Sequence, residues 1–298
     1  MTTRTRQDPK TQYPEPPFPK QQQEPPGTEA ELKPKADHGE ESYEGSGRLT
    51  DRVALITGGD SGIGKAVAIA FAREGADVVV SYLGGVEEAD AADTADWVEK
   101  AGRRALTVAG DLQDPEFCAS LVGRADDELG HLDILVNNAA WQECGDRIEE
   151  VTTDEWQRIF RTNIEAIFHM SKAAVPRLRE GGTIINTTSI QAYSPSAELL
   201  PYAATKGAIV TFTKGLAQDP GVLDRGLRVN AVAPGPIWTP LIPSTMPPEK
   251  AAKFGENTPM GRAGQPAELA PVYVFLASQE SSYITGEVIG VTGGRPLG

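Results

Sequence analysis

Cysteine, histidine and long apolar runs are what this chain of 298 residues has least of. The two cysteines, Cys118 and Cys144, are too few for a disulfide framework. With neither a Cys-x-x-Cys motif nor a helix-spaced pair of histidines, we expect no metal site. His38, His131 and His169 lie far apart in the sequence, so we interpret each as a surface or packing residue.

Positive charge is also scarce. The chain has 28 Lys and Arg against 42 Asp and Glu, a formal net charge of −14. Such an acidic chain disfavours a phosphate-backbone ligand, so we expect no nucleic acid partner. No apolar run approaches the length of a membrane span, and the N-terminus has no apolar signal core. We therefore expect no membrane partner and a cytoplasmic location.

Residues 1–48 differ from everything that follows. They are rich in Pro and Gln and show neither a helix period nor a strand period. Alone, such a segment is disordered or polyproline-like, because it buries too little apolar surface to offset its ordering entropy. Tyr13 and Phe18, set among prolines, offer a way to pin it to its own domain or to a neighbouring subunit. The pattern leaves both states open, disordered or docked.

From residue 49 onward, short apolar runs alternate with helix-like segments, which is typical of a parallel sheet covered on both faces. The sequence therefore predicts an α/β fold in which residues 49–298 form a single catalytic domain. That domain holds a doubly wound, seven-stranded, parallel Rossmann-type sheet. The expected strands are 53–57, 77–82, 104–109, 132–136, 183–188, 228–232 and 287–291. The expected helices are 64–74, 87–100, 115–128, 154–179, 202–218 and 266–277.

A Gly-rich turn, Thr57-Gly-Gly-Asp-Ser-Gly-Ile-Gly-Lys, joins the first strand to the first helix. Glycines let the backbone approach a pyrophosphate, and a helix N-terminus offers free N–H groups and the positive end of a dipole. The spacing Gly58-x-x-x-Gly62-x-Gly64 differs from the Gly-x-Gly-x-x-Gly of the usual two-domain dehydrogenases. A Gly-rich turn is common by itself, and its place after the first strand makes it a candidate nucleotide site.

Ser189 ends an apolar run, and Tyr202 and Lys206 open the helix-like segment that follows. A spacing of four residues puts the Tyr and Lys side chains on one helix face. An ammonium beside a phenol favours the phenolate and lowers a pKa that is ordinarily roughly 10, so the phenol can transfer protons near neutral pH. Tyr-x-x-x-Lys is common on ordinary amphipathic helices, so its meaning depends on the motifs around it.

Taken in order, the motifs resemble the short-chain dehydrogenase/reductase family in its single-domain branch. The resemblance runs from about residue 48 to the C-terminus. The residues that carry it are Thr57-Gly-x-x-x-Gly-Ile-Gly, Asp111-Leu112, Asn137-Asn-Ala-Ala, Asn163, Ser189, Tyr202-x-x-x-Lys206 and Pro234-Gly235. The Pro-rich extension followed by Thr-Gly-Gly-Asp-Ser-Gly-Ile-Gly is also similar to a bacterial subgroup of aldehyde reductases and stress-associated oxidoreductases.

The resemblance implies NAD(P)(H)-dependent interconversion of a carbonyl and an alcohol, with small aldehydes or simple ketones as the substrate class. Tyr202 would supply the proton, and Ser189 would hydrogen-bond the carbonyl oxygen. Lys206 would lower the pKa of Tyr202 and bind the nicotinamide ribose. Asn163 would hold a water that links Lys206 to solvent.

The resemblance also implies the cofactor contacts. They are Gly58, Ser61, Gly62, Ile63, Gly64, Ser81, Tyr82, Asp111, Leu112, Asn137, Ala139, Tyr202, Lys206, Pro234, Gly235, Ile237 and Thr239. Among these, Asp111 would bind the adenine amino group. The family usually has Gly where this chain has Ala140, which adds a Cβ beside the cofactor.

The residues at and near the end of the second strand bear on the choice between NADP and NAD. An acid at the end of the second strand binds a ribose 2′-hydroxyl and repels a 2′-phosphate, but Tyr82 stands where that acid usually lies. The basic residues common in NADP-selective members are also missing, at Ser61 and Leu83. Because Ser81 and backbone amides could accept a phosphate, the sequence slightly favours NADP and leaves NAD open.

Fewer residues bear on the substrate and the assembly. Trp141, Gln142 and Tyr193 are expected to border the nicotinamide, and residues 236–260 fit a mobile lid over the substrate. The resemblance implies a homotetramer, with contacts from Tyr273 and Val288–Val291. Two alternatives remain: a 3-oxoacyl-carrier-protein reductase, which usually needs a basic patch, and a catalytically idle nucleotide-binding sensor.

Overall fold

The computed structural model describes residues 6–145 and 147–298. Its centre is one seven-stranded parallel sheet in the order β3-β2-β1-β4-β5-β6-β7, which confirms the predicted fold class. The strands are β1 Val53–Thr57, β2 Asp77–Tyr82, β3 Ala105–Ala109, β4 Leu132–Asn137, β5 Leu178–Thr187, β6 Arg228–Pro234 and β7 Val288–Val291. The strand order reverses between β1 and β4, and at such a point a crevice opens at the carboxyl ends of the strands.

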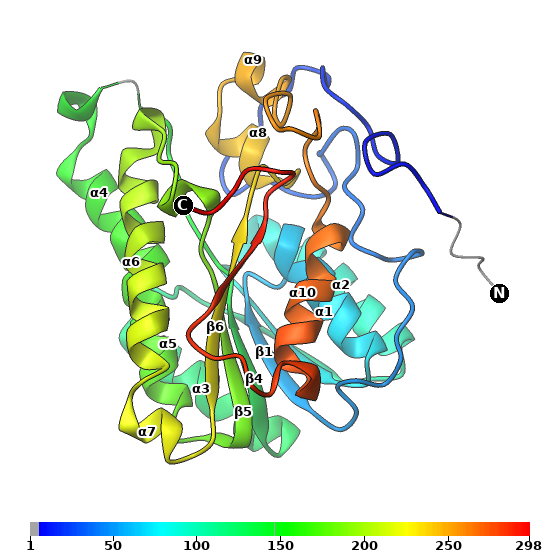
Figure 1. The fold of residues 1–298 in the computed structure, drawn as a ribbon, viewed down its shortest axis with the longest axis vertical. Coiled ribbons are helices and arrows are strands. Elements are labelled where there is room, and N and C mark those ends of the chain that lie inside the picture. Colours follow the sequence, from blue (N-terminus) through cyan, green and yellow to red (C-terminus); the bar gives the residue numbers. More distant parts are fainter. Residues whose placement is uncertain (1–5, 146) are drawn as a thin grey trace.

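Helices cover both faces of the sheet (Figure 1). One face carries α1 Gly62–Arg73, α2 Glu88–Lys100 and α10 Pro266–Ala277. The other carries α3 Pro115–Leu129, α5 Ala166–Ala174 and α6 Leu200–Leu216. Strands β1, β2 and β4 are buried along their whole length, because they pack between two helical layers, and this explains their continuous apolar runs.

The single helix predicted at 154–179 is wrong. The chain instead forms α4 Thr153–Phe160, a π-helical turn η3 at Arg161–Glu165, and α5, which ends at Ala174. A turn at residues 175–177, which contains Pro176, follows, and β5 begins at Leu178. On β5 the Arg179 guanidinium lies 2.7 Å from an Asp133 carboxylate oxygen on β4. Proline is poorly tolerated inside a helix, so the chain leaves the helix before Pro176 and earlier than the sequence suggested, and the ion pair ties the start of β5 to β4.

Short elements complete the fold, and most of them lie around the carboxyl end of the sheet. They are η1 Gly85–Glu87, η2 Ile148–Glu150, η4 Ile190–Ala192, η5 Ala197–Leu199, α7 Pro220–Leu223, α8 Leu241–Thr245, α9 Pro248–Ala251 and η6 Gln279–Ser281. Both α8 and α9 belong to residues 236–260, called the lid below.

Residues 6–48, called the strap below, run beside α8 and α9 and then down toward α1 and α10 (Figure 1). Phe18 is 5% exposed, and its ring centroid lies 4.4 Å from that of the fully buried Trp238. Leu32 is also fully buried in this apolar cluster, and the Trp238 indole N–H donates to the Pro34 carbonyl at 2.8 Å. The two aromatic residues lie 220 positions apart in sequence, so this cluster joins the strap to the lid.

Candidate active site

A cavity of about 370 Å³ opens at the carboxyl end of the sheet. The residues that line it come from the Gly-rich turn, the ends of β2, β4, β5 and β6, the start of α6, and the lid. Pro26 adds a contact from the strap. Most of the predicted cofactor contacts lie in this wall: Gly58, Ser61, Gly62, Ile63, Tyr82, Asp111, Leu112, Ala139, Tyr202, Lys206, Pro234, Gly235, Ile237 and Thr239.

The Gly-rich turn is packed so closely that two of its glycines, Gly62 and Gly64, have no room for a side chain. A Cβ at Gly64 would lie 1.8 Å from the Gly58 carbonyl oxygen. A Cβ at Gly62 would lie 2.9 Å from a methyl carbon of Thr239, and both Gly58 and Gly62 have positive φ angles, +59° and +49°. The turn therefore brings bare backbone and the N-terminus of α1 to the cavity, as a pyrophosphate requires.

Asn138 braces this turn, a role that the sequence did not assign. Its Nδ2 donates to the carbonyl oxygens of Thr57 at 3.2 Å and Gly58 at 3.1 Å. Asn137, the predicted contact, is 2% exposed and points away from the cavity, where its Nδ2 donates to Asn186 Oδ1 at 2.9 Å. Asn137 thus ties β4 to β5, while its neighbour holds the turn. Alternation of side chains along a strand is the signal that separates the two.

The structure brings Ser189, Tyr202 and Lys206 together in the cavity wall. The Ser189 hydroxyl hydrogen-bonds Tyr202. The Lys206 ammonium lies 5.2 Å from the centre of the Tyr202 ring and donates to the Thr187 carbonyl at 2.9 Å. Residues that are up to 17 positions apart therefore meet around one phenol.

The direction of the Tyr202 shift is opposite to the one predicted. Burial raises the pKa of Tyr202 to about 12, and the hydrogen bond from Ser189 only partly opposes it. Burial also lowers the pKa of Lys206 to about 7. Both groups are removed from water, and desolvation disfavours each charged form, so it outweighs the attraction that the spacing of the two residues suggested.

Asn163 is fully buried in the π-helical turn η3 and does not line the cavity. Its Oδ1 accepts from the Trp141 N–H at 2.7 Å, and its Nδ2 donates to the Trp141 carbonyl at 2.8 Å and to Thr205 Oγ1 at 3.1 Å. From this wide turn the amide reaches the loop that follows β4, and these hydrogen bonds account for an Asn inside a helix. A water held by Asn163 stays a prediction.

At the adenosine end, Tyr82, Leu83, Asp111 and Leu112 line the cavity as expected. The carboxylate of Asp111 accepts from the Gln113 backbone N–H at 2.9 Å. Ser81 is not part of the wall: it is 1% exposed, and its hydroxyl is buried without a hydrogen-bond partner.

Two buried acids in this wall, Asp60 and Glu87, were not singled out from the sequence. Burial raises the pKa of both carboxyls, and that of Asp60 reaches about 8 with a contribution from the charge of Glu87. Asp60 lies inside the Gly-rich motif, so its position there was the available signal. Glu87 is one acid in an acid-rich stretch, and sequence alone does not distinguish it from Glu88.

Trp141 and Gln142 line the opposite end, whereas Tyr193 does not. The Gln142 amide donates to Thr245 Oγ1 at 2.9 Å, which ties the loop after β4 to the lid. The Arg158 guanidinium lies 3.7 Å from the centre of the Trp141 ring and also reaches the cavity.

Tyr273 is not a subunit contact, contrary to expectation. It is fully buried on α10, and its hydroxyl shares a hydrogen bond of 2.7 Å with Thr187 Oγ1. Strand β7, the other predicted contact, is a partly exposed edge of the sheet.

Within residues 6–145 and 147–298, no group of three or more His, Cys, Asp or Glu side chains is arranged to hold a metal ion. In the same part of the chain, every helix is too short or too polar to cross a membrane.

A glycine turn at the N-terminus of α1, set at the switch point of a doubly wound sheet, defines a nucleotide-binding α/β protein. The protein-family model described as enoyl-(acyl carrier protein) reductase matches residues 58–295. A short-chain dehydrogenase of Burkholderia cenocepacia, crystallised in complex with NADP, superposes with a TM-score of 0.76 at 33% identity, over 83% of this chain and 98% of that one. The chain belongs to the short-chain dehydrogenase/reductase family of oxidoreductases.

Relatives match almost the whole chain, including most of the strap. The uncharacterized oxidoreductase YghA of Escherichia coli is 54% identical over 98% of both chains. Glucose and ribitol dehydrogenase of Daucus carota is 46% identical over 93% of this chain and 96% of its own. The chloroplastic NADPH-dependent aldehyde reductase 1 of Arabidopsis thaliana is 46% identical over 90% of this chain and 94% of its own.

Proposed function

We propose that this protein is an NAD(P)(H)-dependent oxidoreductase that interconverts a small carbonyl compound and its alcohol, with Tyr202 as the proton donor and acceptor. The observation that carries the proposal is the meeting of Ser189, Tyr202 and Lys206 in one wall of the cavity whose other end is the Gly-rich turn. Proton transfer and nucleotide binding thus share one site.

The residues around the cavity fit a nicotinamide nucleotide. Gly58 and Gly62 bring backbone at the α1 N-terminus to the cavity wall. The Gly62 N–H now donates to the Glu29 carboxylate of the strap at 2.8 Å, so a pyrophosphate would share or replace an anion that this amide already binds. Ile237 and Thr239, from the lid, line the same cavity, and Thr239 packs close to Gly62 of this turn. When bound, the nicotinamide supplies or accepts the hydride.

The chain's own residues handle the proton. Tyr202, with a pKa raised by burial, is protonated at neutral pH and donates to the oxygen of a carbonyl substrate as that oxygen gains negative charge. Ser189 already hydrogen-bonds the phenol, so it lies where it also stabilises the substrate oxygen. Lys206, held by the Thr187 carbonyl, is the neighbouring group that can return a proton to the phenol.

The names of two relatives support a polyol or aldehyde substrate, since one is a glucose and ribitol dehydrogenase and the other an aldehyde reductase. Both reactions exchange a hydride and a proton between a C–OH group and a carbonyl. We therefore assign this chain to the same chemistry, with aldehydes and sugars as the first compounds to assay.

The experiment follows nicotinamide absorbance against a panel of aldehydes, sugars and an enoyl thioester, with both cofactors. Tyr202→Phe is expected to lower kcat by at least about a hundredfold, the usual contribution of a positioned acid–base group, while cofactor affinity stays the same. Tyr283→Phe, at a fully exposed tyrosine, is the matched control and should turn over like the wild type. Retained activity in Tyr202→Phe would refute the assignment of the proton donor.

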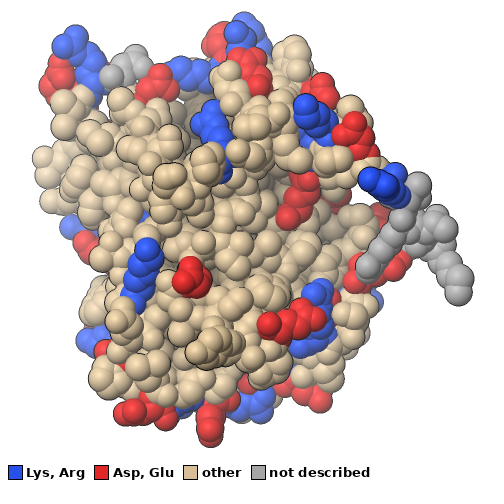
Figure 2. All heavy atoms as spheres, viewed as in Figure 1, with Lys and Arg blue, Asp and Glu red and all other residues tan. Residues whose placement is uncertain are grey.

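Two alternatives make different predictions in the same assay. An idle nucleotide sensor would bind cofactor tightly and turn over nothing in the panel. A carrier-protein reductase needs a basic surface for its acidic partner, but on the face shown in Figure 2, Lys and Arg stand singly among acidic and uncharged residues. The net charge of −14 points the same way.

We also propose that the protein assembles as a homotetramer. Apolar side chains are exposed on α4, α5 and α6, where Trp156 is 39%, Phe168 45% and Leu200 36% exposed. A groove of about 220 Å³ runs between Trp156, Leu200 and the residues near η2. Exposed apolar surface of this kind commonly marks a subunit contact.

A further inference from the structure

The corner of the cavity beside the end of β2 carries two carboxylates, Asp60 and Glu87, that proton transfer at Tyr202 does not use. Asp60 is 3% exposed and Glu87 is 8% exposed. Buried carboxylates need hydrogen-bond donors or cations around them. The groups that surround these two therefore show which ligand the corner accepts.

Glu87 already occupies the backbone amides that follow β2. Its Oε2 accepts from the Leu83 N–H at 2.9 Å, and the Gly84 N–H also hydrogen-bonds its carboxylate. Successive backbone N–H groups at such a turn form an anion-binding concavity. The slight preference for NADP in the sequence analysis assumed that these amides could bind a 2′-phosphate. Because a side chain of the protein itself fills this concavity, an added phosphate would have to displace it.

Asp60 enters the same corner from the Gly-rich turn. The Thr94 hydroxyl donates to the Asp60 carbonyl oxygen at 2.8 Å, which fastens the turn to α2, and the Ser61 hydroxyl hydrogen-bonds the Asp60 carboxylate. The two carboxylates are close enough for the charge of Glu87 to act on Asp60. Because the pKa of Asp60 is raised to about 8, the pair holds a proton near neutral pH. It then offers both a donor and acceptor oxygens to the hydroxyls of a ribose, and its remaining charge repels a second anion.

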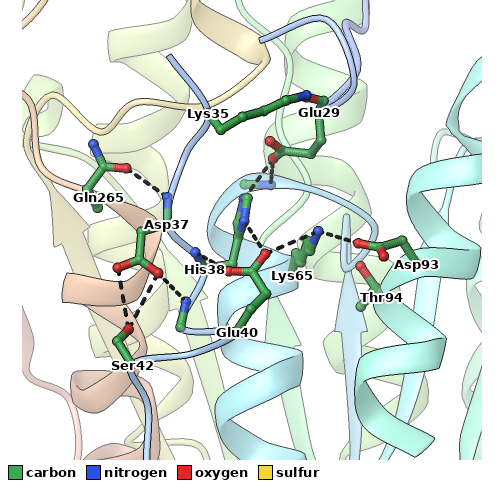
Figure 3. A network of polar contacts seen from close by, with 12 residues as sticks. Glu29, Lys35, Asp37, His38, Glu40, Ser42, Lys65, Asp93, Thr94 and Gln265 are labelled. Atoms are coloured by element: carbon green, nitrogen blue, oxygen red, sulfur yellow. Dashed lines mark hydrogen bonds and ion pairs between the residues drawn. The ribbon is translucent and has the colours of Figure 1, made fainter. Parts of the chain in front are cut away.

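Two basic side chains, Lys65 on α1 and His38 in the strap, already have acidic partners (Figure 3). The Lys65 ammonium lies 2.6 Å from Asp93 and 3.5 Å from Glu40. His38 lies between two strap carboxylates, 2.8 Å from Glu29 and 3.0 Å from Glu40. Neither cation is available to a phosphate without breaking an ion pair that it already makes.

Other cations in the described part of the cavity wall belong to its opposite side. They are Arg158 on the Trp141 ring, Lys206 on the Thr187 carbonyl, and Arg295, whose guanidinium donates to the Asn257 carbonyl. Each of these partners follows β4, ends β5 or belongs to the lid. The described wall at the end of β2 is acidic, with no cation to balance a phosphate.

We propose that Asp60 and Glu87 form the subsite for an unphosphorylated adenosine ribose, and that the protein consequently binds NAD(H) in preference to NADP(H). The two acids replace the single acid that is missing at Tyr82. This inference rests on the proposed function for the identity of the cofactor class. It reverses the slight preference for NADP, since Ser81 lies outside the wall and the amides after β2 bind Glu87.

Direct titration with NADH and NADPH, followed by protein fluorescence or calorimetry, tests the proposal. The wild type should bind NADH at least about tenfold more tightly, the size that one unfavourable charge contact gives. Glu87→Gln keeps an amide oxygen that can accept from the Leu83 N–H but loses the charge, so the ratio should shrink about tenfold. Glu99→Gln removes an exposed charge from the far end of α2 and should leave the ratio unchanged.

Equal or tighter binding of NADPH by the wild type would overturn the proposal, and so would a ratio that does not change in Glu87→Gln. If Glu87→Gln fails to fold, Asp60→Asn provides the second variant, measured above about pH 8, where Asp60 is ionised, with the same expected direction. The readout is a dissociation constant, so it remains decisive even if every carbonyl substrate fails. Absent turnover with a strong NADH preference would refute the proposed reaction and support this subsite.

Discussion

Replacing Phe18 with Ala tests whether the strap is part of the folded domain, which we propose. Phe18 is 5% exposed, and its ring packs at 4.4 Å on Trp238, which is itself fully buried. The loss of a buried phenylalanine ring costs about 3–5 kcal/mol when the site cannot collapse. Phe18→Ala should therefore lower the free energy of unfolding, provided that the strap stays docked until the sheet unfolds.

If the strap detaches first, local opening precedes global unfolding. The substitution can then lower the free energy of unfolding of the sheet by no more than the free energy with which the strap docks. That case has its own signature. Trp238 would lose both the Phe18 ring and its hydrogen bond to the Pro34 carbonyl, so its fluorescence would shift to the red. If the strap stays docked until the sheet unfolds, we expect a lower Tm. If it detaches first, we expect the red shift together with faster proteolysis within residues 10–35, while the circular dichroism of the core stays unchanged.

Tyr283→Ala is the matched control, because it removes an aromatic ring that is fully exposed and should change stability by no more than about 0.5 kcal/mol. Deleting residues 1–48 is a less informative test. Glu74, fully buried at the end of α1, would lose the Tyr43 hydroxyl at 2.6 Å and the Arg48 guanidinium at 2.6 Å. Wild-type melting, fluorescence and proteolysis in Phe18→Ala would refute docking.

Two further predictions concern pH and assembly. Burial alone would lower the pKa of His38, but the carboxylates of Glu29 and Glu40 have the larger combined effect and raise this pKa to about 9. The ion pairs therefore contribute stability, on the order of 3 kcal/mol, that is fully present below about pH 6.5 and is lost as the pH rises through about 9. Melting curves across this window should fall more steeply for the wild type than for His38→Gln, and parallel curves would contradict it. For assembly, the molar mass by light scattering should be four times that of the 31.8 kDa chain, and Trp156→Glu should lower it; a monomeric wild type would contradict the tetramer.

The fold was predictable because its signals are repeated along the chain. Each buried strand carries its own apolar run, as in Val53–Thr57, and parallel strands between helices leave few other arrangements. The Gly-rich turn was predictable for a different reason. Each of its glycines is required by a contact with the backbone or with Thr239, so the motif reflects the geometry directly.

Features that depend on distant partners could not be predicted in this way. At the π-helical turn Arg161–Glu165, Asn163 hydrogen-bonds the backbone of Trp141, 22 positions away, and helix periodicity carries no trace of that contact. Tyr273 was expected at a surface, yet its helix α10 packs against both α1 and the sheet. The spacing of Tyr202 and Lys206 showed their proximity but not their burial, and burial determines the direction of both pKa shifts.

The strap contacts both sides of the cavity, and this affects how any variant in it should be interpreted. Glu29 accepts from the Gly62 N–H at 2.8 Å, so the strap reaches the first amide of the helix that faces the cofactor pyrophosphate. A few residues earlier, Gly27 has no room for a Cβ, which would lie 2.8 Å from the carbonyl oxygen of Pro240 in the lid. A variant at Gly27 or Glu29 therefore alters a contact with the lid or with the phosphate-binding turn. Loss of activity in such a variant can be assigned to the chemistry at Tyr202 only after cofactor affinity has been measured and found unchanged.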